Sequence, residues 1–410
     1  MSRPIRYMLI AGIGVLILTI AQWITDTAEL TAPNTAGAAL RLAIPILLAG
    51  LGGLYSERAG IVNIGLEGMM IAGTWFGAWG SWLYGPWNGV LFGLLGGAAF
   101  GLLHGLATVT FNVDHIVSGV AINILGLGAM RFLSSITYNP ETGGSVVQSP
   151  PVQGVGSVSL PFFAGGDLFG WRSPDLFGWL DRQGWFFISD LGGILKGFFG
   201  GVSWLTLVGL ILVPLTAWLL WRTPWGLRLR SCGEDPWAAE SLGVSVLRMK
   251  YYGVMISGGL AGLGGAFLVL VQAGIYREGM TAGRGFIGLG ALIFGNWIPS
   301  GVLTGAFVFG FGDSLRFRGP DVVRAFILAV AIALLLAAAY AIFQRTSRRA
   351  VLMGGVGAGF LVFYLLVQQV PNQLLAATPY LITLFVLAAA SQRLRMPAAD
   401  GARYARGEAR

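Results

Sequence analysis

Residues 325–343 read AFILAVAIALLLAAAYAIF, a run without a charged or amide side chain. A helix needs about 20 predominantly apolar residues to cross the hydrocarbon core of a bilayer. Similar runs are MLIAGIGVLILTIAQWI at 8–24 and WLTLVGLILVPLTAWLLW at 204–221. A membrane β-barrel would instead alternate apolar and polar residues in segments of about ten. The sequence therefore predicts an all-α, polytopic membrane protein.

The composition of the chain supports this fold class. Of 410 residues, 55% are hydrophobic and 11% are charged, whereas a soluble domain usually has about 25% charged residues. The formal net charge of +8 could suggest a nucleic-acid partner, but the arginines gather in short loops and near the C-terminus. That placement is typical of orientation signals in membrane proteins. We therefore expect membrane lipid, and no nucleic acid, as a partner.

Ten to twelve transmembrane helices are expected from the apolar runs. The run at 285–296 is too short to cross a bilayer alone, so we predict a half-helix or a re-entrant piece there. The expected spans are 7–24, 36–55, 64–84, 88–110, 114–136, 203–221, 250–274, 285–296, 299–315, 321–343, 349–369 and 376–392.

The chain divides into two membrane halves, an insert and a tail. The insert opens with Gly, Ser, Pro and Val, which predict loops and short strands, and continues with aromatic residues that suit the membrane interface. We favour a surface cap over a docking site for the insert. The parts are the N-terminal half 1–138, the outer insert 139–202, the C-terminal half 203–392 with a cytoplasmic loop at 222–250, and the basic cytoplasmic tail 393–410.

The arginine-rich segments set the predicted orientation. The N-terminus with Arg3 and Arg6, the loop at 222–250, the loop at 344–349 and the tail can all lie in the cytoplasm if 285–296 counts as a crossing. Arg316, Arg318 and Arg324 then lie outside, against the usual bias.

The 64 glycines point to close packing of helices. They concentrate in GLLGGAAFGLLHG at 93–105 and in SGGLAGLGGAF at 257–267. Small residues let the backbones of membrane helices approach one another. We expect most of these glycines to serve packing.

Residues 56–70, SERAGIVNIGLEGMM, place polar side chains between two apolar runs. A second glycine-interrupted segment lies at 274–296, and each precedes a hydrophobic piece and a glycine-rich helix. Paired broken segments in two halves of a transporter indicate an internal inverted repeat around a midplane site. We therefore predict broken or half-helices and such a repeat.

Five residues near these segments are candidates for a substrate pathway, each with a structural alternative. A charge at the bilayer centre is costly, so Glu67 faces a water-filled cavity or stabilises the first turn of its helix, and Asn63 is a candidate N-cap of that helix. For Asn123 we slightly favour a hydrogen bond between helices, and for Trp75 core packing is the commoner role. Asn296 is an interface anchor or a pathway residue. The candidates are Asn63, Glu67, Trp75, Asn123 and Asn296.

The sequence does not favour an enzyme. Two histidines and one cysteine are too few for a usual His/Cys metal site, and no GxxxxGK[ST] pattern exists for nucleotide phosphates. We therefore expect no metal and no cofactor of its own. ATP, if used, is hydrolysed by another subunit.

The cytoplasmic loop contains PWGLRLRSCGEDPWAAESLGVSVLRMKYY at 224–252. Asp235 suits the N-cap of a short helix, Pro236 its first position and Gly243 a left-handed C-terminus. Such a helix is either a simple connector or a projecting knob that fits a groove on a soluble partner.

This loop and the next helix resemble those of ABC-importer permeases in the branched-chain amino acid and ribose superfamily. SERAGIVNIGLEGMM narrows the resemblance to the branch for simple sugars and nucleosides, which works with a basic-membrane-protein type lipoprotein. GRGFIGLGALIFGNWIPSGVLTGAFVFG at 283–310 and TPYLITLFVLAAASQRLRMPAADGARYARGE at 378–408 also look like that branch. The likeness covers about 36–408, and the enlarged insert departs from it.

The resemblance implies a multi-pass permease of the plasma (inner) membrane. It would work with a separate ATP-binding subunit, a second permease subunit in a homo- or heterodimer, and an extracytoplasmic binding lipoprotein. A nucleoside is the first expected solute, and a simple sugar or riboflavin the next. An ion-coupled secondary transporter is a different class that also uses broken helices. The implied contacts to the ATP-binding subunit are Gly233, Glu234, Asp235, Pro236, Ala239, Leu242 and Gly243.

Overall fold

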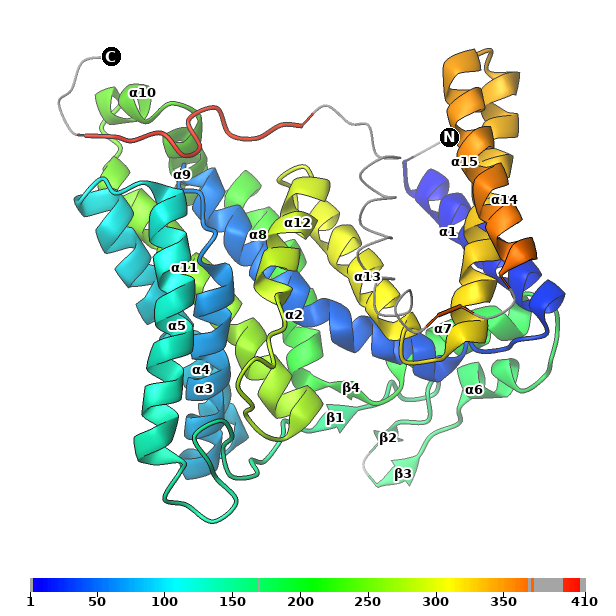
Figure 1. Ribbon diagram of the computed structural model, residues 1–410, viewed down its shortest axis with the longest axis horizontal. Helices are drawn as coiled ribbons and strands as arrows, with labels where there is room; N and C mark the ends of the chain where they lie inside the picture. The colour runs from blue at the N-terminus through cyan, green and yellow to red at the C-terminus, as the bar shows by residue number, and fades with distance from the viewer. Residues whose placement is uncertain (1–2, 169, 368–369, 372–393, 406–410) are drawn as a thin grey trace. The chain divides into compact units, whose positions relative to one another are not determined.

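The described part of the protein is mainly helical, and its longest stretch without a helix, residues 138–175, lies in the insert (Figure 1). The computed structural model describes residues 3–168, 170–367, 370–371 and 394–405. The long helices are α1 (Arg3–Thr25), α2 (Pro33–Arg58), α3 (Leu66–Tyr84), α4 (Pro86–Gly105), α5 (His115–Thr137), α8 (Trp204–Arg222), α11 (Val246–Phe267), α13 (Pro299–Leu315), α14 (Pro320–Phe343) and α15 (Ser347–Leu366). The shorter helices are α6 (Leu176–Asp181), α7 (Ile188–Phe199), α9 (Pro224–Glu234), α10 (Pro236–Ser241) and α12 (Arg284–Phe294).

The all-α membrane fold predicted from the sequence is confirmed. Within the described part of the chain, 7 helices are long and apolar enough to cross a membrane. The predicted half-helix at 285–296 is α12, which is indeed short. The total of ten to twelve crossings stays a prediction, and the expected span 376–392 lies outside the described residues.

Two features of the helices were not predicted. The loop at 222–250 holds a further helix, α9, whose first turn is capped by Thr223. The Thr223 hydroxyl accepts a hydrogen bond from the Gly226 N–H at 3.1 Å. α4 and α11 also continue as π-helical turns, η1 (Leu106–Thr110) and η2 (Leu268–Ala273). The apolar pattern does not distinguish a π-helical turn from an α-helical one, because both continue the same run.

The chain forms two compact units, each built from separate stretches of sequence. One unit comprises Met1–Leu40, Val158–Val202 and Gly310–Val386, and the other comprises Arg41–Ser157, Ser203–Phe309 and Leu387–Arg410. We call them unit 1 and unit 2. The predicted division into membrane halves, insert and tail stays a prediction of topology.

Unit 2 is organised around α11, which packs against α3 and α4. Glycines make this packing close. A Cβ on Gly262 would lie 2.8 Å from Gly97 Cα, and one on Gly258 would lie 2.9 Å from Gly101 Cα. The two glycine-rich stretches named from the sequence therefore face each other across the α4–α11 contact. The sequence predicted that these glycines serve close packing, and it did not indicate which helices would meet.

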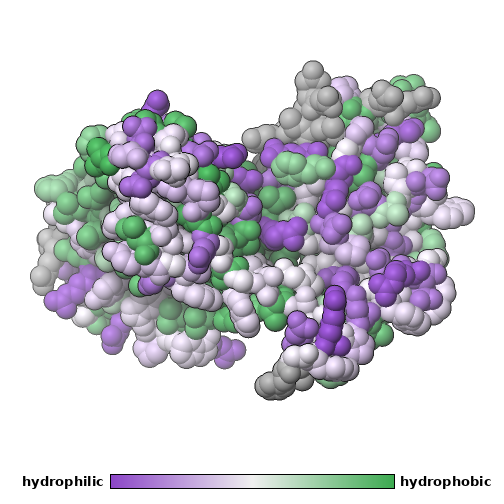
Figure 2. Space-filling model, turned by 90° about the horizontal axis from the view of Figure 1, so that it is seen from below, coloured by the Kyte–Doolittle hydropathy of each residue, from purple (hydrophilic) through white to green (hydrophobic). Residues whose placement is uncertain are grey.

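Unit 1 contains α1 packed on α14, and α14 packed on α15. The insert contributes α6, α7 and a small antiparallel hairpin of β2 (Asp167–Leu168) and β3 (Trp171–Arg172), while β1 (Ser157–Val158) pairs with β4 (Val202–Ser203) at its edge. The loops and short strands expected early in the insert are thus present. Figure 2 shows hydrophilic and hydrophobic residues mixed over the face of the molecule that is seen from below.

Two of the three arginines that weakened the predicted orientation, Arg316 and Arg318, have acidic partners in unit 1. Arg316 pairs with Asp313 at 2.8 Å, and Arg318 lies 3.9 Å from Glu29. Neighbouring carboxylates reduce the effective positive charge of this segment. Arg324 instead lies over the Tyr364 ring, 4.7 Å from its centroid. The orientation of the chain stays a prediction.

Candidate functional site

The segment between α2 and α3 is a break in the helical path, and four of its carbonyl groups are met by polar side chains. Non-helical backbone at membrane depth is tolerated only where protein or water satisfies its polar groups. The partners come from α2, α4, α5 and α11. They are Ser56 Oγ to Ile61 O at 2.6 Å, Lys250 Nζ to Gly60 O at 3.3 Å, His104 Nε2 to Val62 O at 3.3 Å and Asn123 Nδ2 to Ile64 O at 3.0 Å.

Asn63 lies inside this break and is fully buried. Its amide donates a hydrogen bond to the Ser257 hydroxyl of α11 at 2.8 Å. The prediction that Asn63 caps α3 is wrong, because the N-cap is Gly65 and no side chain caps the helix there. The helix begins later than expected, and the amide of Asn63 reaches toward α11 instead.

Asn123 joins α5 to the start of α3. Its Oδ1 accepts a hydrogen bond from the Gly68 N–H at 2.7 Å, while its amide donates to Ile64 O as described above. The Asn123 side chain thus binds a carbonyl before α3 and an N–H group in the first turn of α3. The helix-to-helix hydrogen bonding favoured from the sequence is present.

Glu67 is buried in the first turn of α3, with 7% of its surface exposed. Its two carboxylate oxygens accept hydrogen bonds from the Gly283 N–H at 2.9 Å and the Gly285 N–H at 2.7 Å. These N–H groups belong to the free N-terminus of α12, where a carboxylate is electrostatically favourable. Glu67 therefore links the two broken segments that the sequence had paired.

The remaining pathway candidates lie away from this cluster. Trp75 is buried in an aromatic group, 5.2 Å from the Tyr138 ring, and its indole N–H donates to the Ser134 hydroxyl at 3.0 Å. Asn296 lies in the turn after α12, where its Oδ1 accepts a hydrogen bond from the Arg395 N–H at 2.6 Å. The structure therefore brings Asn63, Glu67 and Asn123 together and places Trp75 and Asn296 elsewhere.

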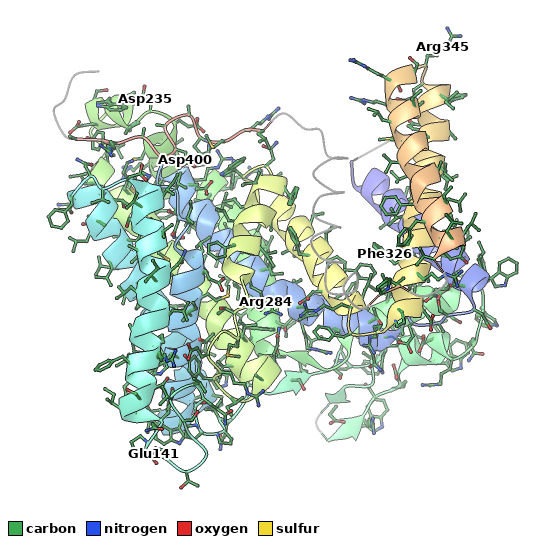
Figure 3. All side chains as sticks on the ribbon, viewed as in Figure 1. Glu141, Asp235, Arg284, Phe326, Arg345 and Asp400 are labelled. Carbon is green, nitrogen blue, oxygen red and sulfur yellow. The ribbon has the colours of Figure 1, made fainter. Side chains whose placement is uncertain are left out.

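The short helix α10 has the caps that the sequence predicted. The Asp235 carboxylate accepts hydrogen bonds from the Trp237 and Ala238 N–H groups, both at 3.1 Å. Pro236 occupies the first turn, and Gly243 adopts a left-handed φ of +80°. In Figure 3, Asp235 and Asp400 lie at one end of unit 2 and Glu141 lies at the opposite end.

The other residues expected to contact the ATP-binding subunit divide into buried and exposed positions. Ala239 is buried, and Gly233 is packed so closely that an added Cβ would lie 3.1 Å from Gly60 N. Glu234 approaches Arg58 at 3.5 Å. Leu242, at the end of α10, is 84% exposed. Leu242 therefore projects an apolar side chain from the end of the capped helix α10.

Trp297 is a partner of the charged residues that end α2, which no local sequence pattern indicates. Its indole N–H donates to the Glu57 carboxylate at 2.5 Å, and its carbonyl accepts from the Arg58 guanidinium at 2.8 Å. These residues are about 240 positions apart in the chain, so only a structure could join them. Among the described residues, no group of three or more His, Cys, Asp or Glu side chains is arranged to hold a metal.

The described residues thus combine apolar helices long enough to cross a membrane, two broken segments joined by Glu67, and the short capped helix α10. Residues 35–339 match the family described as branched-chain amino acid transport system / permease component. The chain belongs to this family, which confirms the resemblance inferred from its motifs. It is a permease subunit of an ABC transport system and a multi-pass protein of the plasma membrane, a transport component rather than an enzyme.

Individual relatives extend along most of the chain. It is 32% identical to the guanosine ABC transporter permease protein NupQ of Bacillus subtilis, over 90% of this chain and 96% of the relative. It is 30% identical to the nucleoside ABC transporter permease protein NupC of Lactococcus lactis, over 88% and 93%. A putative glucose ABC transporter permease protein, TsgC13 of Haloferax volcanii, is 30% identical over 69% and 77%. No solved structure matched the chain.

Proposed function

We propose that this protein is the permease of an importer for nucleosides. The observation that carries the proposal is the similarity to two permeases named for guanosine and nucleosides, over about nine-tenths of the chain. The relative named for glucose covers a smaller share, so a simple sugar is the second candidate. Riboflavin, which carries a ribityl chain, is the third.

In this proposal the energy comes from ATP hydrolysed by a separate subunit, and the chain needs no cofactor of its own. The sequence has no GxxxxGK[ST] pattern. The capped helix α10, with exposed Leu242 at its end, is the surface on which the ATP-binding subunit docks. A second permease subunit, identical or different, completes the pathway, and an extracytoplasmic lipoprotein delivers the solute.

The geometry of Glu67 argues against the ion-coupled alternative. An ion or proton site in the membrane needs a carboxylate that can exchange partners. Both oxygens of Glu67 are held by backbone N–H groups of the α12 N-terminus. This supports a structural carboxylate, and the same contacts weigh against direct contact between Glu67 and the solute.

Uptake by whole cells tests the proposal. The permease is expressed with the ATP-binding subunit, the lipoprotein and any second permease encoded beside it, and uptake of radiolabelled guanosine, cytidine, glucose and riboflavin is measured. We expect nucleoside uptake that ATP depletion abolishes and that a protonophore leaves intact when ATP is maintained. Uptake of glucose or riboflavin alone would overturn the nucleoside assignment. Loss of uptake with the protonophore at constant ATP would overturn the ABC mechanism.

A further inference from the structure

The C-terminal segment 394–405 lies across the end of unit 2 that holds α9 and α10 (Figure 1). It makes a tight turn, in which the Asp400 N–H donates to Pro397 O at 3.2 Å and the Ala402 N–H donates to Ala399 O at 3.1 Å. Pro397, Ala399 and Tyr404 are buried, whereas Ala398 and Arg403 are exposed. This pattern of burial is that of a segment seated on a surface. We call residues 394–405 the strap.

The strap holds the end of α9 and the coupling helix α10. The Ala399 N–H donates to Gly233 O at 2.9 Å, and the Ala398 N–H donates to the Glu234 carboxylate at 3.2 Å. The Tyr404 ring meets the Trp237 ring edge to face, with centroids 5.8 Å apart. Main-chain and aromatic contacts therefore join the strap to Gly233, Glu234 and Trp237, at the end of α9 and the start of α10.

The same strap also reaches the membrane helices. Its Arg395 N–H donates to Asn296 in the turn between α12 and α13. At Gly60, just after α2, a Cβ would lie 3.2 Å from Cys232 O and 3.3 Å from Ala399 O, and φ is +81°. The backbones of the break, of α9 and of the strap thus converge at a position that favours glycine.

We propose that the strap fastens α10 to the C-terminal end of α2 and to the turn at residues 296–297. These parts would then move together when the ATP-binding subunit displaces α10. The inference rests on the proposed docking of that subunit on α10. Alone, α10 is a single turn and a half of helix, and its caps do not attach it to the membrane helices. The strap contacts α9 and α10 and also contacts Gly60 and Asn296 beside the membrane helices. It is a positioning element that need not touch the solute.

The single cysteine of the chain provides a direct probe of strap seating. Cys232 is fully buried in a cluster with Ala239, Val246 and Tyr404. Burial raises the pKa of its thiol to about 11, which lowers its reactivity further. A maleimide can therefore modify Cys232 rapidly only after the strap or α10 has moved away.

The test compares adjacent alanines given the same substitution. Ala399→Gln places a larger polar side chain at a buried position, and Ala398→Gln places it at an exposed one. In membranes that contain the full transporter, we expect Ala399→Gln to label at Cys232 about tenfold faster than the wild type, because seating contacts are lost. Uptake per permease molecule falls by at least a similar factor. Ala398→Gln matches the wild type in both.

Three outcomes decide the inference. Slow labelling and normal uptake in Ala399→Gln overturn it. Fast labelling with normal uptake also overturns it, since the strap would then be released from its seat without any effect on transport. If Ala399→Gln does not accumulate in membranes, deletion of residues 394–410 is measured in the same way, and wild-type uptake per molecule overturns the inference.

A separate variant distinguishes the strap from the docking proposal on which it rests. Leu242→Asp changes only the exposed end of α10, and Leu227→Asp changes a 60% exposed residue of α9 as a control. If Leu242→Asp leaves uptake and co-purification of the ATP-binding subunit intact, docking on α10 is refuted. If Leu242→Asp abolishes both while strap variants have no effect, docking stands and the strap inference falls.

Discussion

Glu67 Oε2 accepts a hydrogen bond from the Gly285 N–H at 2.7 Å, across 218 residues of sequence. One residue lies in the first turn of α3 and the other in the first turn of α12. Each of these helices follows a break, so the contact joins the two interrupted regions of unit 2. A Cβ on Gly285 would lie 2.6 Å from Glu67 Cα, which leaves room only for glycine.

We predict that Glu67→Gln weakens the fold and leaves solute selectivity unchanged. The glutamine amide keeps one acceptor and turns its NH₂ group toward a backbone N–H, so one buried donor loses its partner. A loss of that kind costs about 1–3 kcal/mol. Thermal unfolding of the detergent-solubilised permease is expected to shift to lower temperature, and the relative uptake rates of different nucleosides are expected to stay as in the wild type.

Glu141→Gln is the control for this variant, because Glu141 is exposed in the loop after α5. It is expected to match the wild type in both measurements. A Glu67→Gln protein of normal stability whose nucleoside preference has changed would show that Glu67 contacts the solute.

The glycine contact between α4 and α11 gives a second prediction. A Cβ on Gly97 would lie 2.6 Å from Gly262 Cα, whereas a Cβ on Gly128 of α5 meets nothing within 4 Å. Overpacking a close-packed site costs about 1–3 kcal/mol, and a leucine at a backbone contact falls at the upper end. Gly97→Leu is therefore expected to reduce the monodisperse fraction of solubilised protein, measured by size-exclusion chromatography.

Gly128→Leu carries the same change on an open face and is expected to elute as the wild type does. Equal behaviour of the two variants would mean that glycine spacing does not set the α4–α11 distance.

Regular features of this fold were open to prediction from the sequence because each rests on a local rule. Apolar runs long enough to cross a bilayer gave the helices, and the Asp235–Pro236 pair with Gly243 gave the caps of α10. The clustered glycines indicated that the helices carrying them pack closely against other helices. In each case the residues that decide the feature are neighbours in the sequence.

Features that depend on contacts between distant residues were not accessible. Asn63 looked like a helix cap, but Ser257, 194 positions later, takes its amide hydrogen bond. Trp297 donates a hydrogen bond to Glu57, and the strap contacts Gly233 and Trp237. No local pattern marks such partners, so a single sequence shows the polar residues without showing what they bind.

The N-cap of α10 supplies a third prediction. Asp235→Arg removes the acceptor for two N–H groups and puts a cation at the helix N-terminus, at a cost of about 1 kcal/mol for the cap plus an unfavourable dipole interaction. We expect uptake to fall strongly while ATP hydrolysis by the complex persists and the amount of permease in the membrane is unchanged. Asparagine caps helices as well as aspartate does.

Asp235→Asn is accordingly expected to retain most of the uptake. If the asparagine variant fails as completely as the arginine variant, the carboxylate itself is required and capping is not the reason. Normal uptake in Asp235→Arg would refute a coupling role for α10.

The fourth prediction concerns the pH dependence of strap seating. Burial, together with the neighbouring Glu57 carboxylate, raises the pKa of Asp400 to about 9, from an ordinary value of 3.8. A raised pKa means that the seated strap binds the proton more tightly than the released strap. Seating is then fully favoured below the ordinary pKa of an aspartate and is progressively lost as pH rises toward about 9.

Maleimide labelling of Cys232 at pH 6.0 and pH 8.5, values chosen inside that window, checks this expectation. Each rate is divided by the rate for the unfolded chain at the same pH, because thiolate formation alone speeds labelling as pH rises. We expect the normalised rate to increase with pH in the wild type and to stay flat in Asp400→Asn, which cannot ionise. Asp114→Asn is the control, since hydrogen bonds from the Val117 and Ile116 N–H groups lower the pKa of Asp114 and keep it ionised throughout. An unchanged pH dependence in Asp400→Asn would assign the effect to another group and leave the strap without a titrating carboxyl.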